Sequence, residues 1–205
     1  MSENRGLFVR ISSHGKSRLA VSTPRSAIAL TFTDSGIAVR IGLKNCEATS
    51  WPRVKKLISP LPFAPGNGGV IQEQWQSGQL EIEVVPQGTL VERLRAGGAG
   101  IGGVFLATAV GTRFETGKEK RSFANGEAVL ELPMKADYAL IKVTTADTLG
   151  SAIYEGSGRN WAPVMAMAAR ITIAEAEHIV GPGELNPEGI ISPGIFVNRI
   201  VAAND

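Results

Sequence analysis

Two parts of the chain carry side chains suited to binding an acid or an amide. In residues 81–112, Gln87 has an amide that both donates and accepts hydrogen bonds, and the glycine-rich run 97–103 lets a backbone approach a ligand or turn sharply. Farther on, Arg159 and Asn160 can hold a carboxylate by directed hydrogen bonds. For this pair the alternative stays open that it caps a helix or ties two loops together.

A strand, a turn and a helix are predicted to position the glutamine. Residues 80–84 alternate apolar and acidic side chains, the pattern of a strand with one buried face, and Pro86 should end that strand. The next two residues form a turn, and Thr89 begins a helix with Glu92 at capping-box spacing. Gln87 would then follow the C-terminal end of a strand, where open α/β sheets bind ligands.

The glycines Gly98, Gly100 and Gly103 fit the GxGxxG pattern of dinucleotide-binding proteins. That fingerprint needs a strand before it and a helix after it, whereas here a predicted helix precedes it and the apolar segment 104–106 follows. The order of elements therefore argues against a nicotinamide site. Two interpretations remain: the glycines pack a loop against the sheet, or they allow close backbone approach to a ligand.

The rest of the chain alternates strand and helix patterns, which predicts an α/β fold with an open, mostly parallel sheet and helices on both faces. A charged, turn-rich segment at 113–126 is expected to be a surface hairpin. The expected strands are 54–58, 80–84, 128–132, 136–144 and the region 171–180, with helices at 70–77 and 164–169 and a final strand or packing segment at 196–201.

Composition excludes several classes of protein. The 205 residues are 43% hydrophobic, and no stretch approaches the 18 apolar residues of a membrane span. The single Cys46 allows no internal disulfide and suits a reducing compartment. The chain shows no Ser-His-Asp grouping, no clustered Cys and His ligands and no GxxxxGK[ST] loop, which argues against a hydrolase, a metal enzyme and an NTPase.

Charge is distributed unevenly along the chain. Residues 1–56 hold ten Lys or Arg and three acidic residues, a net charge of +7, whereas the remainder carries a net charge of −5. A basic end can indicate a nucleic-acid arm or a targeting segment. Aromatic residues for base stacking are not interleaved with these charges, so we expect no nucleic-acid partner.

Four motifs together resemble the alpha (A) subunit of the family I, 3-oxoacid CoA-transferases. These are PQGTLVERLRAGGAGIGG at 86–103, TAVGT at 108–112, YEGSGRNWAP at 154–163 and PGELNPEGIISPGI at 182–195. They occur in the family's order and spacing, and the likeness covers roughly residues 53 to 201. The resemblance implies an α/β sheet of the Rossmann-like CoA-transferase type.

The resemblance also implies a reaction. Such an enzyme moves CoA from an acyl-CoA, such as succinyl-CoA, to a 3-oxoacid or another short carboxylic acid through an intermediate on a glutamate. That glutamate belongs to a beta subunit, so we expect no catalytic residue here and no activity from this chain alone. We expect an alpha/beta heterotetramer in the cytoplasm, with a CoA thioester as substrate and with no metal, permanently bound cofactor or membrane partner.

By residue-by-residue comparison, this chain would contribute one wall of the pocket. Gln87 matches a glutamine that faces the family's active site, with the alternative that it merely closes a turn. The other wall residues we expect are Gly88, Gly98, Gly100, Gly103, Thr108, Arg159 and Asn160. The segments 106–109 and 158–163 depart from the family's usual Thr-Pro-Thr-Gly and Ala-Arg-Asn-Phe-Asn-Pro, so the acid is not transferred from any one relative.

Residues 1–52 depart most from the family, because its Gly-Gly-Phe loop and Asn-Asn-Ala-Gly turn are missing. We therefore divide the chain into an atypical basic segment, 1–52, disordered or unrelated to the family, and an alpha-subunit domain, 53–205. Three explanations for the segment stay open: divergence, a targeting peptide, which would make the location mitochondrial, or a wrong start or shifted frame. The last would make the chain a non-catalytic remnant, which is the alternative function.

Overall fold

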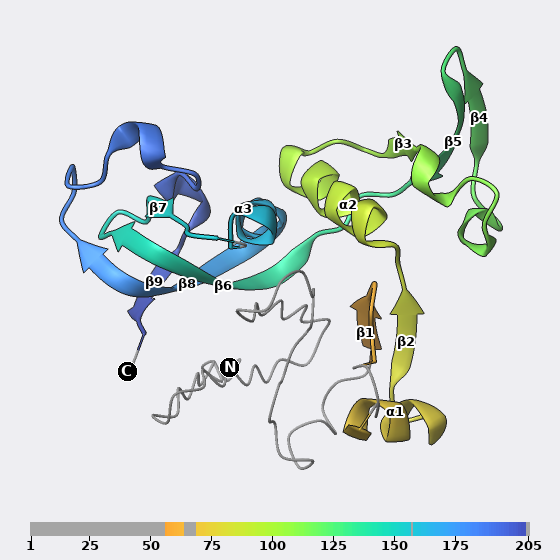
Figure 1. Cartoon of the computed structure of the whole chain (residues 1–205), viewed down its shortest axis with the longest axis horizontal. Coiled ribbons are helices and arrows are strands. Elements are labelled where there is room, and N and C mark those ends of the chain that lie inside the picture. The colour runs from red at the N-terminus through yellow and green to blue at the C-terminus, as the bar shows by residue number, and fades with distance from the viewer. Residues whose placement is uncertain (1–55, 64–68, 157, 204–205) are drawn as a thin grey trace, which may run out of the picture.

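The computed structural model describes residues 56–63, 69–156 and 158–203 (Figure 1). The predictions for residues 1–52 therefore lie outside the described residues. The described part begins with two parallel strands and the helix between them. Strand β1 (Lys56–Ser59) pairs with β2 (Glu81–Val84), with Leu57 opposite Ile82, and α1 (Gly69–Gln76) connects them. The ends of these three elements lie within two residues of the ends predicted from the sequence.

Helix α2 (Gln87–Ala99) begins two residues earlier than predicted. Pro86, with φ −52° and ψ 142°, is its N-cap, so Gln87 lies in the first turn of the helix and not in a preceding turn. The predicted capping box at Thr89 is therefore wrong. The apolar side of α2 is as expected, because Leu90 and Leu94 are buried.

The same helix also extends further than predicted at its other end. Gly97 and Gly98 lie in its last turn, and the helix stops at Gly100, whose φ of 73° is in the left-handed region that glycine adopts without strain. The glycine-rich run is thus partly helix and only partly loop.

A small antiparallel sheet follows, in the order β3-β5-β4. Its strands are β3 (Val104–Leu106), β4 (Lys120–Phe123) and β5 (Gly126–Glu131), with the short 3-10 helices η2 (Ala107–Ala109) and η3 (Arg113–Glu115) between β3 and β4. All four residues of β4 are exposed, and the β4–β5 hairpin extends away from α2 (Figure 1). A surface hairpin is confirmed, but the start of the predicted segment 113–126 is the 3-10 helix η3, and the hairpin is formed by β4 and β5.

The largest sheet has the order β7-β6-β8-β9. The two long strands β6 (Ala136–Asp147) and β8 (Ala169–Val180) are parallel, β9 (Arg199–Ala202) is parallel to β8, and β7 (Ala152–Ile153) is antiparallel to β6. Helix α3 (Gly158–Ala168) runs between β7 and β8, and the C-terminal segment contains η4 (Pro187–Gly189) and η5 (Gly194–Phe196). The predicted α/β class is confirmed.

Helices α2 and α3 and the long strands share one core. Buried residues from α2, α3 and β6 pack together, with Trp161 and Met165 of α3 among the largest. Helix α3 begins six residues before the predicted helix, so Arg159 and Asn160 lie in its first turn and not in a loop ahead of it. None of the helices in the described part of the chain combines the length and apolar character that a membrane crossing requires.

Candidate functional site

Gln87 is exposed and stands where parallel strands end. It follows β2 by three residues, so it lies at the carboxyl end of the β1–β2 pair, the edge at which open α/β sheets bind ligands. Its neighbour Gly88 is also exposed. The first turn of α2 thus presents an amide side chain and a bare stretch of backbone to the solvent.

Thr108 lies next to this turn although it is about twenty residues away in the sequence. Its hydroxyl is 2.9 Å from the hydroxyl of Thr89, and a β-carbon placed on Gly88 would lie 3.7 Å from its methyl group. Thr108 is exposed in η2, whereas Thr89 is buried in α2. The structure therefore brings Thr108 against Gly88, the residue after Gln87.

The N-terminus of α2 favours negative charge at this place. Among the described residues no side chain caps it, and the backbone bond of its first turn joins Leu90 N–H to the Pro86 carbonyl. The first N–H groups of an α-helix have no partner within the helix, and they form the positive end of the helix dipole. A carboxylate or a developing oxyanion beside Gln87 would be stabilised by these free N–H groups and by the helix dipole.

The glycines expected in the same wall lie at the other end of α2. Eleven residues at 1.5 Å each separate Gln87 from Gly98 by about 16 Å. A β-carbon on Gly98 would lie 2.7 Å from Met167 Cβ, and one on Gly103 would lie 3.0 Å from Leu130 Cδ1. Contacts within the protein thus account for these two glycines, and Gly100 ends the helix.

That arrangement favours the packing interpretation, and a ligand-binding role for these glycines stays a prediction. Gly98 of α2 contacts Met167 near the end of α3. This contact lies toward the amino ends of β6 and β8, because α3 leads directly into β8 there. Ligands of open α/β sheets bind at the opposite, carboxyl edge.

Arg159 and Asn160 are both exposed in the first turn of α3. Arg159 Nε donates to the Tyr154 carbonyl at 2.9 Å, which ties the start of the helix to the segment before it. Eight helical residues, about 12 Å, separate this turn from Met167 at the α2 crossing. The hydrogen bond supports the alternative of a structural tie, and the substrate role of this pair stays a prediction.

A buried contact that the sequence did not indicate joins two of the resemblance motifs. The Tyr154 and Ser192 hydroxyls are 2.6 Å apart and both side chains are buried, so the C-terminal segment is fastened to the body at this point. Burial raises the pKa of the Tyr154 phenol above its usual value, and the hydrogen bond with Ser192 partly opposes that rise. Tyr154 therefore acts here as a neutral hydrogen-bonding group.

Ion pairs join β1, β2 and α2 near the candidate site. Lys56 Nζ lies 2.7 Å from Glu81 and 2.9 Å from Glu83, and Arg93 of α2 lies 3.3 Å from Glu83. Glu81 and then Glu83 raise the pKa of Lys56 through their hydrogen bonds. Burial alone would raise the pKa of Glu83, but its bonds with Lys56 and Arg93 outweigh burial and lower it.

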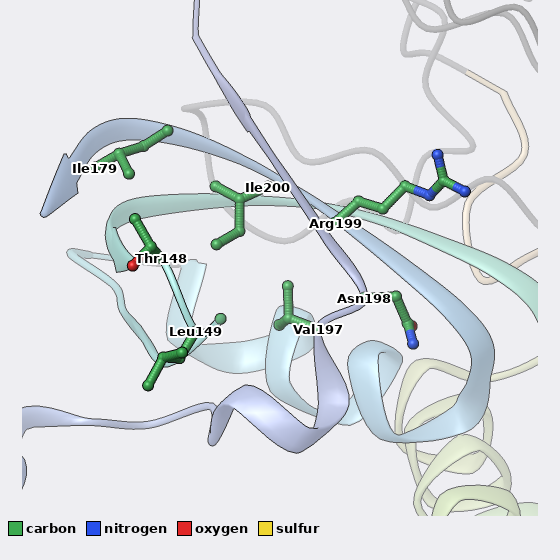
Figure 2. Close-up of a pocket in the computed structure, with 8 residues that line it drawn as sticks. Thr148, Leu149, Ile179, Val197, Asn198, Arg199 and Ile200 are labelled. Atoms are coloured by element: carbon green, nitrogen blue, oxygen red, sulfur yellow. The ribbon is translucent and has the colours of Figure 1, made fainter. Parts of the chain in front are cut away.

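A shallow cavity of about 350 Å³ lies at the carboxyl ends of β6 and β8 (Figure 2). Leu149, Ile179, Val197 and Ile200 give it apolar walls, and Arg199 extends away from them. Its lining includes none of the predicted site residues. Within the described ranges, no three His, Cys, Asp or Glu side chains are grouped so that they could hold a metal ion.

Comparison with known proteins places this geometry in a family. The family model described as Coenzyme A transferase matches residues 34–203, so the match begins ahead of the predicted boundary at residue 53. The division of the chain at that residue stays a prediction.

Two relatives are the A-type subunits of such enzymes. The one from the probable succinyl-CoA:3-ketoacid coenzyme A transferase of Bacillus subtilis is 42% identical over 183 residues, which cover 85% of this chain and 76% of the relative. The one from the 3-oxoadipate CoA-transferase of Pseudomonas putida is 45% identical over 151 residues, which cover 74% of this chain and 65% of the relative.

A solved structure supports the fold. Glutaconate coenzyme A-transferase of Acidaminococcus fermentans superposes with a TM-score of 0.60 at 18% identity, over 76% of this chain and 59% of that one. The order of elements and these matches agree with one another, whereas the role of Gln87 stays a prediction. The chain belongs to the coenzyme A transferase family and is an enzyme subunit of the alpha, or A, type.

Proposed function

We propose that this chain is the alpha subunit of a CoA-transferase that moves CoA from an acyl-CoA, such as succinyl-CoA, to a 3-oxoacid or another short carboxylic acid. The observation that carries the proposal is the exposed Gln87, within the family's motif and at the carboxyl end of parallel strands, with Thr108 against the neighbouring Gly88. The two relatives, named for a 3-ketoacid and for 3-oxoadipate, support the class of acid and leave the choice within it open.

The reaction proceeds by covalent catalysis on a glutamate of the beta subunit. The glutamate carboxylate attacks the acyl-CoA carbonyl, and the carbon–sulfur bond breaks. CoA leaves as a thiolate, and a mixed anhydride of the glutamate and the donor acid remains. The thiolate then attacks the glutamyl carbonyl, which releases the donor acid and forms a glutamyl thioester. The acceptor carboxylate repeats the two steps in reverse, which yields the new acyl-CoA and the free glutamate.

This chain's residues act on the oxygens of those intermediates. The Gln87 amide donates a hydrogen bond to the carbonyl oxygen as it becomes negative, and the N–H groups at the start of α2 add positive potential. Gly88 leaves room for the substrate, since no side chain projects from it. In this account Arg159 and Asn160 contribute the second region of the wall.

The proposal includes a partner and excludes a resident cofactor. A beta subunit supplies the reactive carboxylate, two copies of each subunit form the assembly, and the CoA thioester enters as substrate without a bound metal or prosthetic group. We place the enzyme in the cytoplasm. Both relatives are named as one lettered subunit of their enzymes, which supports the need for a partner chain.

Co-expression with the beta subunit of a CoA-transferase tests the proposal. The purified complex should transfer CoA from succinyl-CoA to acetoacetate or 3-oxoadipate, and neither subunit should do so alone. In Gln87→Ala we expect kcat/KM to fall about 100-fold, the usual loss for one donor to a developing oxyanion. Gln79→Ala is the matched control, because Gln79 is also exposed but lies before β2. A stable complex without any turnover would favour the remnant instead.

A further inference from the structure

Two threonine hydroxyls meet at the start of α2, beside the proposed site. Thr89 Oγ1 and Thr108 Oγ1 are 2.9 Å apart, and they join the first turn of α2 to η2. Their environments differ sharply, because Thr89 is 1% exposed whereas Thr108 faces the solvent. Within the described residues, Thr108 is the hydrogen-bond partner of the Thr89 side chain.

The difference in burial decides which hydroxyl donates. A hydroxyl carries one proton and two lone pairs, so the bond uses the proton of one threonine only. If the buried Thr89 accepted, its own proton would have no acceptor away from water, which is the costlier state. Thr89 therefore donates and Thr108 accepts, and the Thr108 proton is free to point toward the exposed side.

The position of Thr108 is fixed as well as the direction of its hydrogen bond. Its neighbour Ala109 is fully buried, and the Ala109 carbonyl accepts a hydrogen bond from Thr112 Oγ1 at 2.7 Å, so η2 cannot easily swing away. The Thr108 methyl group lies against Gly88, the residue after Gln87. An O–H donor thus stands at the start of α2, next to Gly88 and Thr89.

We propose that Thr108 donates a hydrogen bond to the carboxylate of the acceptor acid, and that Thr89 is the positioning residue that fixes the direction of the Thr108 hydroxyl. The inference rests on the proposed function and names the residues that recognise its acid. The Thr108 hydroxyl and the unpaired N–H groups at the start of α2 are donors that suit the oxygens of a carboxylate.

Four variants of the complex with its beta subunit test this pairing. Thr108→Val keeps the shape of the side chain and removes the donor, so we expect the KM for the acceptor acid to rise about tenfold with a smaller change in kcat, as for loss of one hydrogen bond to a charged group. Thr89→Val should raise the same KM about threefold to fivefold, since the Thr108 hydroxyl is then free to rotate. Thr89→Ser, which keeps the hydroxyl, should behave as wild type.

The double variant shows whether Thr89 acts through Thr108. Thr89→Val combined with Thr108→Val should have the KM of Thr108→Val alone, because the positioning residue has nothing left to orient. Independent, additive effects would overturn the inference, and so would a Thr89→Ser variant as impaired as Thr89→Val, which indicates packing. If the wild-type complex is active and KM is unchanged in both valine variants, this inference is wrong and the proposed function still stands. An inactive wild-type complex would overturn the proposed function as well.

Discussion

Replacing Gly97 with alanine should destabilise the protein strongly, although alanine is the better helix former. Gly97 is buried in the last turn of α2 with helical backbone angles, so alanine would gain up to about 1 kcal/mol from propensity and from the unfolded chain. Its β-carbon, however, would lie 2.0 Å from the Met134 carbonyl oxygen and 2.7 Å from the carbonyl carbon. Relief requires a shift of about 1 Å between α2 and the start of β6.

Met134 is poorly placed to yield. Its side chain is 8% exposed, and its N–H donates to the Arg93 carbonyl at 2.8 Å, so moving it disturbs both the core and a backbone bond. Overpacking costs about 1–3 kcal/mol and sometimes more, and a contact of 2.0 Å with a backbone atom puts this case at about 3 kcal/mol. We expect Gly97→Ala to lower the free energy of unfolding by about 2–3 kcal/mol net, and the Tm by about 4–12 °C for a chain of this size.

Thermal and urea unfolding of the purified protein measure the effect. Gly88→Ala is the matched control within the same helix, since its β-carbon would make an ordinary contact at 3.7 Å with Thr108. That variant should be as stable as wild type or up to about 1 kcal/mol more stable. A Gly97→Ala protein within about 0.5 kcal/mol of wild type would refute the close approach of α2 to Met134.

Further predictions concern charge and the buried hydroxyl pair. Because the pKa of Glu83 is lowered in the folded state, its stabilising effect is present above its usual pKa of 4.5 and is lost as the pH falls through the lower folded value. Glu83→Gln should therefore flatten the acid limb of a stability–pH curve, and an unchanged limb would contradict the bonds to Lys56 and Arg93. Tyr154→Phe should lower the free energy of unfolding by about 1–2 kcal/mol, because the buried Ser192 hydroxyl loses its partner. Adding Ser192→Ala to that variant should cost little more, and fully additive losses in urea unfolding would argue against the pairing.

Local patterns predicted most elements correctly. The alternation of residues 80–84 identified β2, and the apolar run from Ala136 identified β6, although the strand continues to Asp147. Periodicity works there because each strand buries one face or both, which constrains residue type directly. Gly78 marked the end of α1 for a similar reason, since its φ of 73° suits glycine.

Helix boundaries and contacts between distant residues could not be predicted from local sequence patterns. Pro86 proved to be an N-cap without a side-chain bond, so the capping signal at Thr89 misplaced the start of α2. Gly97 lies in the helix and close against Met134, a contact that no local pattern encodes. The signal that could have drawn attention to Thr89 was its place in the PQGT motif, but its contact with Thr108 depends on the tertiary fold.

Intact-mass spectrometry of the complex after incubation with succinyl-CoA tests the central claim most directly. We predict that CoA becomes covalently attached to the beta chain and not to this one, and that attachment requires this chain and slows markedly in Gln87→Ala. An adduct on this chain, or an equally fast adduct on the isolated beta chain, would contradict the account of a pocket whose wall and reactive carboxylate come from different chains.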